Sequence, residues 1–286
     1  MKLALLIGIN YENTDSELRG CINDILEMKK ILIEKYNYND IFVLTDNTEI
    51  RPTKANIISE IKKLITKSQT CSEIFIHYSG HGTFVKDNNN EEIDDNDEAL
   101  YPLDCRTTSD LITDDELNSI IFETKCPAKI ILDSCHSGSG LDLHHNAKVS
   151  NKTVVKYDET NNSKNENVIM MLSGCMDNQT SADAYNVTKE KYMGALTSSF
   201  LKILEENGYD ANIDKMLLKL YEKLESLGFS QHPVLSSNKE LNFEYKFLGK
   251  NEINQPINEP INEPTNEPTN EPTNPLKYNC ECCVIA

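Results

Sequence analysis

The sequence has no apolar run approaching the roughly 20 residues that a membrane-spanning helix needs, so no transmembrane segment is predicted. Basic residues are also scarce: 28 lysines and arginines stand against 46 aspartates and glutamates, a formal net charge of −18. A nucleic-acid-binding protein needs a basic face for phosphates, so this charge argues against that class. The excess of acid instead suits cationic partners, such as metal ions or basic peptides.

Several common site motifs are missing. The nine cysteines are an odd number without a framework spacing, which favours free thiols in a reducing, cytoplasmic setting. There is no His-Glu-x-x-His motif for zinc and no Gly-x-Ser-x-Gly motif for a serine nucleophile. The one Cys-x-x-Cys pair, Cys280 with Cys283, has no second pair to complete a zinc site. The apolar start of the chain lacks a cleavage site, so it is interpreted as a buried strand.

Over the first 250 residues, short apolar runs alternate with amphipathic stretches. This order predicts an α/β fold, with a mainly parallel central sheet flanked by helices. The expected strands are 3–9, 41–44, 73–78, 129–132, 170–173 and 243–247. The expected helices are 16–36, 53–67, 113–123, 195–206 and 213–226, with Thr53 and Thr113 as N-caps. The polar stretches 86–97 and 143–167 are expected to be surface loops.

The last part of the chain has a different composition. From Pro256 to Pro272 a proline recurs at every fourth position, which excludes helix and sheet and predicts an extended tether over 251–279. The Cys-rich tail 280–286 follows. In it, Cys283 begins a C-a-a-X pattern whose final Ala favours farnesylation, and Cys280 and Cys282 are candidates for a second lipid. Such lipids could attach a cytoplasmic protein to the cytoplasmic face of a membrane.

Two expected strands run into unusual sequences. One strand leads into Ser-Gly-His-Gly at 79–82, and the other leads into Asp-Ser-Cys-His-Ser-Gly at 133–138. In a parallel sheet, ligands bind beyond the carboxyl ends of the strands. There a cysteine thiolate can attack a carbonyl while an imidazole moves the proton, and glycine-flanked N–H groups can bind the oxyanion. The pair His81 and Cys135 therefore predicts a cysteine nucleophile with its base.

His-Tyr-Ser-Gly-His-Gly and Asp-Ser-Cys-His-Ser-Gly-Ser resemble the two signature motifs of the metacaspases, which are caspase-like cysteine peptidases. The resemblance extends over residues 1–248 and includes Leu-Leu-Ile-Gly-Ile-Asn-Tyr and Leu-Arg-Gly-Cys-Ile-Asn-Asp. It implies a caspase–haemoglobinase fold with a large segment (1–142), an inter-segment loop (143–167) and a small segment (168–250). It also implies a catalytic dyad of His81 and Cys135, with an oxyanion hole formed by Gly82 and the amide of Cys135. In this dyad the His81 imidazole either polarises the substrate or activates Cys135.

The resemblance further implies cleavage after Arg or Lys rather than Asp. The residues of the basic-selective S1 pocket map onto Cys21, Asp24, Ser79 and Asp133. Two carboxylates in a pocket favour a cationic side chain and repel an acidic one. Without the resemblance, Asp24 is equally well a solvated helix acid and Asp133 a residue that ends a strand.

A calcium site is implied as well. Its ligands map onto Asp97, Asp114, Asp115 and Asp142, whose hard oxygen donors suit Ca²⁺. Asp114 and Asp115 would also suit the positive end of a helix dipole.

The sequence as a whole therefore predicts a calcium-dependent, monomeric cysteine endopeptidase acting on peptides and proteins that contain Arg or Lys. The alternative is a membrane-tethered scaffold or regulator of the same fold, with little proteolysis. The loop 143–167 contains Lys148, Lys152, Lys156 and Lys164, so it is either an autoprocessing linker or an uncut loop.

Overall fold

The computed structural model describes residues 1–86, 96–134, 141–158, 165–174, 183–186, 191–229, 231–249 and Asn251. Met1–Asn251 forms one compact unit, and Glu252–Ala286 is grouped apart from it. The expected tether and the tail, with Cys280, Cys282 and Cys283, lie outside the described residues. No helix in the described part of the chain is long and apolar enough to cross a membrane.

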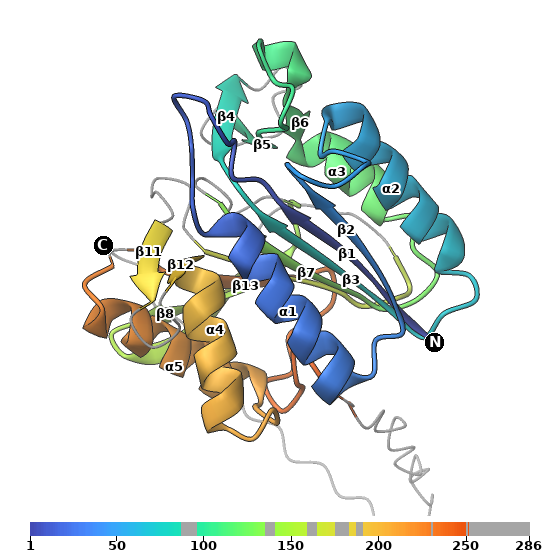
Figure 1. The fold of residues 1–286 in the computed structure, drawn as a ribbon. Coiled ribbons are helices and arrows are strands. Elements are labelled where there is room, and N and C mark those ends of the chain that lie inside the picture. The colour runs from blue at the N-terminus through green and yellow to red at the C-terminus, as the bar shows by residue number, and fades with distance from the viewer. Residues whose placement is uncertain are drawn as a thin grey trace, which may run out of the picture. The chain divides into compact units, whose positions relative to one another are not determined.

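An eight-stranded sheet forms the centre of the compact unit (Figure 1). Its strand order is β2-β1-β3-β7-β10-β13-β8-β9. The first five strands in this order pair in parallel, and the last three are antiparallel to their neighbours. Their bounds are β1 (Lys2–Gly8), β2 (Asp40–Thr45), β3 (Glu73–Ser79), β7 (Ala128–Asp133), β8 (His145–Ser150), β9 (Thr153–Asp158), β10 (Ile169–Ser173) and β13 (Val234–Ser237).

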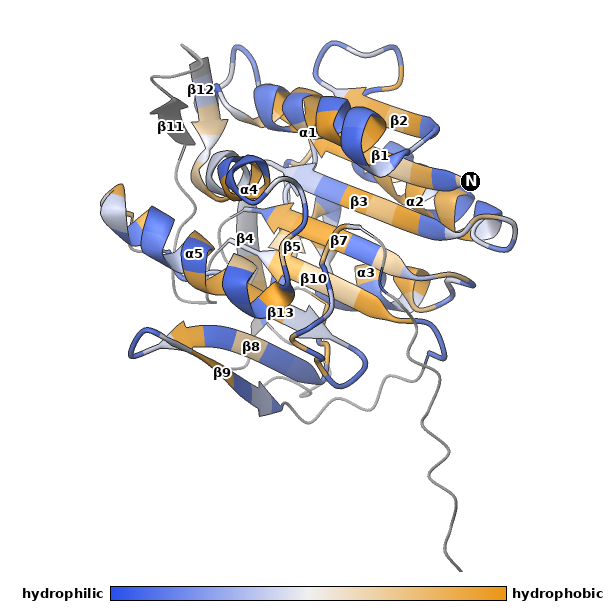
Figure 2. Cartoon of the chain, turned by 90° about the horizontal axis from the view of Figure 1, so that it is seen from below, coloured by the Kyte–Doolittle hydropathy of each residue, from blue (hydrophilic) through white to orange (hydrophobic). Residues whose placement is uncertain are grey.

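Helices cover both faces of this sheet. One hydrophobic cluster joins the sheet to α1 (Cys21–Tyr36), α4 (Ala195–Glu206) and α5 (Ile213–Ser226). The other joins it to α2 (Lys54–Lys67) and α3 (Asp114–Ile121). Along β1, Leu3, Leu5 and Ile7 belong to one cluster and Ala4 and Leu6 to the other, which explains why the central strands are largely apolar (Figure 2). The predicted α/β architecture with a mainly parallel sheet is confirmed.

Two small sheets contain the remaining described strands, and Thr108–Asp110 forms a 3₁₀ helix. β4 (Gly82–Lys86), β5 (Asn96–Leu100) and β6 (Ile112–Thr113) form one, and β11 (Asp183–Asn186) pairs with β12 (Lys191–Gly194) in the other. The expected loop 86–97 therefore overlaps two strand ends, and its residues 87–95 lie outside the described part.

The predicted helix starts and ends are largely confirmed. α4 and α5 have the predicted bounds. Thr53 and Thr113 accept hydrogen bonds from Asn56 N and Glu116 N, so both are N-caps. The first helix begins at Cys21 rather than at residue 16.

The prediction of a surface loop over 143–167 was wrong for much of its length. β8 and β9 form an antiparallel hairpin there, and β8 also pairs with β13. Asn151 and Lys152 between the two strands have φ of 50° and 59°, the left-handed values that a two-residue hairpin turn requires. Ala147 and Val149 are buried on alternate positions of β8. A composition rich in lysine and asparagine concealed this alternation.

The prediction of a strand at 243–247 was also wrong. Asn242 closes a turn there: its Oδ1 accepts from Glu244 N at 3.0 Å, and its backbone oxygen accepts from Tyr245 N at 3.0 Å. Asparagine side chains favour such turns over strands because they supply a local acceptor for the backbone. The last described strand in the sequence is β13, and in the sheet it lies between β10 and β8.

Candidate active site

The two motif segments leave the sheet side by side. β3 and β7 are neighbours with Ser79 opposite Asp133, and the Gly80 N–H donates to the backbone oxygen of Asp133 at 3.3 Å. His81 therefore lies at the same carboxyl edge as the end of β7, as predicted. Cys135 lies outside the described residues, and so does its amide. Gly82, the other expected oxyanion residue, is the first residue of β4.

Two buried tyrosines hold the backbone of His81. The His81 N–H donates to Tyr11 Oη at 3.0 Å, and Tyr78 Oη donates to the His81 carbonyl at 2.8 Å. Burial raises the pKa of both phenols, so they remain protonated donors at neutral pH. A Cβ at Gly80 would lie 2.7 Å from Tyr78 Oη and 3.0 Å from Tyr11 Oη, so this close approach requires glycine. Sequence reasoning did not assign a role to either tyrosine, although both stand within the quoted motifs.

One hydrogen bond fixes which nitrogen of His81 carries the proton. Nε2 lies 2.8 Å from the backbone oxygen of Ser16, which can only accept. The Nε2 atom is therefore the donor, and in the neutral ring Nδ1 keeps the lone pair. The Tyr11 ring packs against the imidazole at a centroid distance of 4.7 Å. A neutral imidazole held in this way is a base presented through Nδ1.

The expected S1 residues gather beside this edge. Asp24 is fully buried on the first turn of α1 and accepts a hydrogen bond from Ser79 Oγ at 2.8 Å. Asp133, at the end of β7, is also buried. Cys21 precedes Asp24 by three residues, so the two lie on one face of α1. The four predicted pocket residues therefore come from three separate stretches of the sequence and lie at one corner of the fold.

Two residues that sequence reasoning missed hold these carboxylates. The Gly194 N–H donates to both oxygens of Asp24, at 2.9 and 3.0 Å. Thr197 donates to Asp133 Oδ2 through its N–H at 2.9 Å and its hydroxyl at 2.7 Å. Gly194 is the N-cap of α4 and has no side chain, so Asp133 caps this helix from another element.

A buried histidine extends the network behind Asp133. His77 Nε2 lies 3.1 Å from Thr197 Oγ1, whose hydrogen is already given to Asp133, so the ring nitrogen is the donor. Complete burial lowers the pKa of His77 to about 3, which keeps the ring neutral. The chain His77–Thr197–Asp133 thus orients one pocket carboxylate.

A cluster of acids lies at the N-terminus of α3. Oxygen atoms of Asp114, Asp115 and Asp142 lie within 4.8 Å of one another, and Asp97 on β5 is buried. Asp114 accepts from Glu98 N at 3.0 Å and from Asp115 N at 2.8 Å. Burial, with a contribution from the charge of Asp97, raises the pKa of Asp114 to about 7. The fold therefore brings together three of the four expected calcium ligands, Asp114, Asp115 and Asp142. Of these, Asp114 is buried where its negative charge is unfavourable without a nearby positive charge.

Comparison with known proteins identifies the family. The family model described as "Metacaspase, peptidase C14 domain" matches residues 2–144. Metacaspase-1 of Schizosaccharomyces pombe is 32% identical over 294 residues, which cover 84% of this chain and 68% of that protein. The chain belongs to the metacaspase family. Metacaspase-1 of Saccharomyces cerevisiae is likewise 32% identical over 302 residues, covering 86% of this chain and 68% of its own length.

As a metacaspase, the chain is a cysteine-type peptidase. It spans about two thirds of the length of these relatives. A solved structure of a protein from Geobacter sulfurreducens, 20% identical, covers 86% of this metacaspase and 97% of its own chain with a TM-score of 0.60, which supports the fold alone.

Proposed function

We propose that this metacaspase is a calcium-dependent endopeptidase that cleaves after Arg or Lys. The observation that carries the proposal is the pair of buried carboxylates, Asp24 and Asp133, beside the carboxyl edge that presents His81. Each carboxylate is held by hydrogen bonds from the protein, so the two negative charges are fixed in place before a substrate arrives.

The proposed chemistry uses the cysteine and the histidine in turn. His81 Nδ1 takes the proton of Cys135, whose thiolate attacks the carbonyl carbon of the scissile bond. The amides of Gly82 and Cys135 bind the oxyanion of the tetrahedral intermediate. His81 then gives its proton to the leaving amine as the acyl-enzyme forms, and water activated by the same imidazole releases the acid and restores the thiol.

Selectivity should follow the sign of the substrate charge. Peptides ending in Arg or Lys before the cut are expected to be cleaved, and peptides ending in Asp are not. In Asp24→Asn, the shape is kept and one charge is lost. Loss of a charge-assisted contact, about 1.5–3 kcal/mol, should lower kcat/KM for an Arg substrate roughly 10- to 100-fold.

This test uses Arg- and Asp-ending fluorogenic peptides of the same length, with circular dichroism to verify folding. Asp15→Asn removes an exposed acid outside the pocket and should leave kcat/KM unchanged. The protein with Cys135→Ala gives the background rate. Efficient cleavage after Asp, or an Asp24→Asn enzyme as active as the wild type, would contradict the pocket.

Calcium is proposed to bind the acidic cluster. The donors are carboxylate oxygens, which Ca²⁺ prefers, and a cation would stabilise the charged form of Asp114, whose pKa is raised mainly by burial. In the sequence, Asp142 comes shortly after Cys135. The side-chain amide of Asn118 in α3 donates a hydrogen bond to the backbone oxygen of the adjacent Leu141 at 2.7 Å. Calcium there would tie the N-terminus of α3 to the chain that follows Cys135.

Peptidase activity is therefore expected to depend on added Ca²⁺, with Mg²⁺ a poor substitute because it dehydrates reluctantly. Asp115→Asn should raise the Ca²⁺ concentration for half-maximal activity by roughly tenfold or more. The matched control Glu123→Gln neutralises an exposed acid just beyond the end of α3 and should not change that concentration. Full activity of the wild type in excess chelator would remove calcium from the mechanism.

We also propose that Cys283 carries a farnesyl group and that Cys280 or Cys282 is S-acylated. One lipid chain gives only marginal binding, and Lys277 is the only base after Lys250, so a second lipid has to supply the rest. In a eukaryotic cytosol, the wild type should then sediment with membranes, and both Cys283→Ser and the double variant Cys280→Ser/Cys282→Ser should become soluble. A wild type found only in the soluble fraction would contradict the anchor and leave the peptidase proposal intact.

A further inference from the structure

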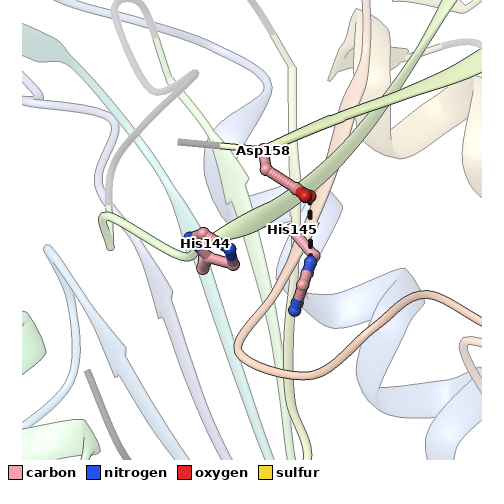
Figure 3. A group of neighbouring side chains, drawn as sticks. All are labelled: His144, His145 and Asp158. Atoms are coloured by element: carbon pink, nitrogen blue, oxygen red, sulfur yellow. Dashed lines mark hydrogen bonds and ion pairs between the residues drawn. The ribbon is translucent and has the colours of Figure 1, made fainter. Parts of the chain in front are cut away.

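Three potential metal ligands meet at the edge hairpin, outside the active site. His145 at the start of β8 faces Asp158 at the end of β9, and its Nδ1 lies 2.9 Å from Asp158 Oδ1 (Figure 3). His144 is the residue before His145. The centroids of the two imidazole rings lie 4.5 Å apart in an edge-on arrangement. One ligand atom from each of the three side chains lies within 4.8 Å of the other two.

The hydrogen bonds leave nitrogen lone pairs for a further partner. If the neutral His145 ring carries its proton on Nε2, the lone pair lies on Nδ1, and Nδ1 and Asp158 Oδ1, 2.9 Å apart, are close enough to be ligand atoms of one ion. His144 Nδ1 is buried and has no hydrogen-bond partner among the described residues. A buried imidazole nitrogen without a partner is costly, and a metal ion would satisfy it.

We propose that His144, His145 and Asp158 bind a divalent cation of the zinc class. Two imidazoles with one carboxylate are ligands for Zn²⁺, Co²⁺, Ni²⁺ or Cu²⁺, whereas Ca²⁺ and Mg²⁺ prefer oxygen alone. Water completes the coordination. The site differs in chemistry from the acidic cluster and does not depend on the proposed calcium or substrate selectivity. The bound ion links the open end of the β8–β9 hairpin at the edge of the sheet.

Cobalt is the probe, because its absorption reports the ligand type. The full-length protein, with Ca²⁺ in excess, is titrated with Co²⁺. We expect visible ligand-field bands that saturate at one equivalent without the near-ultraviolet sulfur-to-cobalt band of a thiolate site, together with a higher melting temperature. His145→Ala should abolish these bands, while His144→Ala and Asp158→Asn should weaken binding roughly 10- to 100-fold.

Matched variants separate this site from the others. His232→Ala removes a histidine outside the cluster, and Asp115→Asn alters only the acidic cluster, so both should bind Co²⁺ like the wild type. Asp158 is 61% exposed, so Asp158→Asn tests the ligand set without disturbing the fold. Bands of thiolate type alone, or cobalt binding unchanged in both His145→Ala and Asp158→Asn, would overturn the proposal.

Discussion

Gly194→Ala is expected to lower kcat/KM for Arg substrates by roughly 100-fold or more, the usual result of displacing catalytic or binding groups by about 1 Å. A Cβ at this position would lie 2.7 Å from Asp24 Oδ2 and 2.8 Å from Asp133 Cγ. Its backbone is ordinary, with φ −60° and ψ 141°, so strain is not the cause. The methyl group would push apart the two carboxylates that Gly194 separates, and would weaken its own hydrogen bonds to Asp24.

Steady-state kinetics on an Arg peptide measures this effect, with thermal melting to compare the folds. Gly228→Ala is the control: nothing lies within 4 Å of its Cβ position, but its φ of 81° makes alanine strained. That variant should lose stability and keep its kcat/KM when folded. A Gly194→Ala enzyme with wild-type kinetics would contradict the role assigned to this glycine.

Lys129→Met is expected to stabilise the protein at neutral pH. Lys129 is buried in β7, with Nζ 3.3 Å from Met170 Sδ, and desolvation lowers its pKa to about 8. Since the folded state prefers the neutral amine, the cost of the charge is absent above the unfolded pKa, grows as the pH falls from about 10 to about 8, and is nearly complete below 8. Relative to an unfolded pKa near 10.4, this cost is about 2–3 kcal/mol at pH 7. Methionine has a similar shape and carries no charge.

Urea unfolding at pH 7 and pH 10 measures this difference. The free energy of unfolding should rise by about 2 kcal/mol or more in Lys129→Met at pH 7 and by much less at pH 10, where the lysine is neutral. Lys62→Met, an exposed lysine on α2, is the control and should change stability by less than about 0.5 kcal/mol at either pH. A variant less stable than the wild type at pH 7 would show that the buried amine makes a favourable interaction.

The central strands could be predicted because burial on both faces leaves a plain mark in the sequence. Leu3 to Ile7 is apolar at every position, as both hydrophobic clusters require. The antiparallel part of the sheet carries no such mark. β13 has four residues, two of them serines, and β8 alternates polar and apolar positions within a lysine- and asparagine-rich stretch. Short strands that contain polar residues are defined by their partners more than by their own composition.

In the candidate site, too, some residues could be predicted from the sequence and others could not. The place of His81 could be predicted because it follows a buried strand, and parallel strands bring their carboxyl ends together. The roles of Gly194 and Thr197 could not be predicted. Gly194 binds a carboxylate 170 residues away and Thr197 one that is 64 residues away, and neither residue type is distinctive at the start of a helix. Only the packing of α4 against β7 and α1 brings them to the pocket.

The strand order also bears on what happens if the chain is cut between β9 and β10. The first fragment would supply β7 and β8, and the second would supply β10 and β13, which lie between those two strands (Figure 2). The strands of the second fragment would thus be hydrogen-bonded on both sides to strands of the first. Gly194 and Thr197 would still reach Asp24 and Asp133 across the break. A nicked protein would therefore separate into two pieces only on denaturation, and the residues of the proposed S1 pocket would be held in place by contacts between two chains.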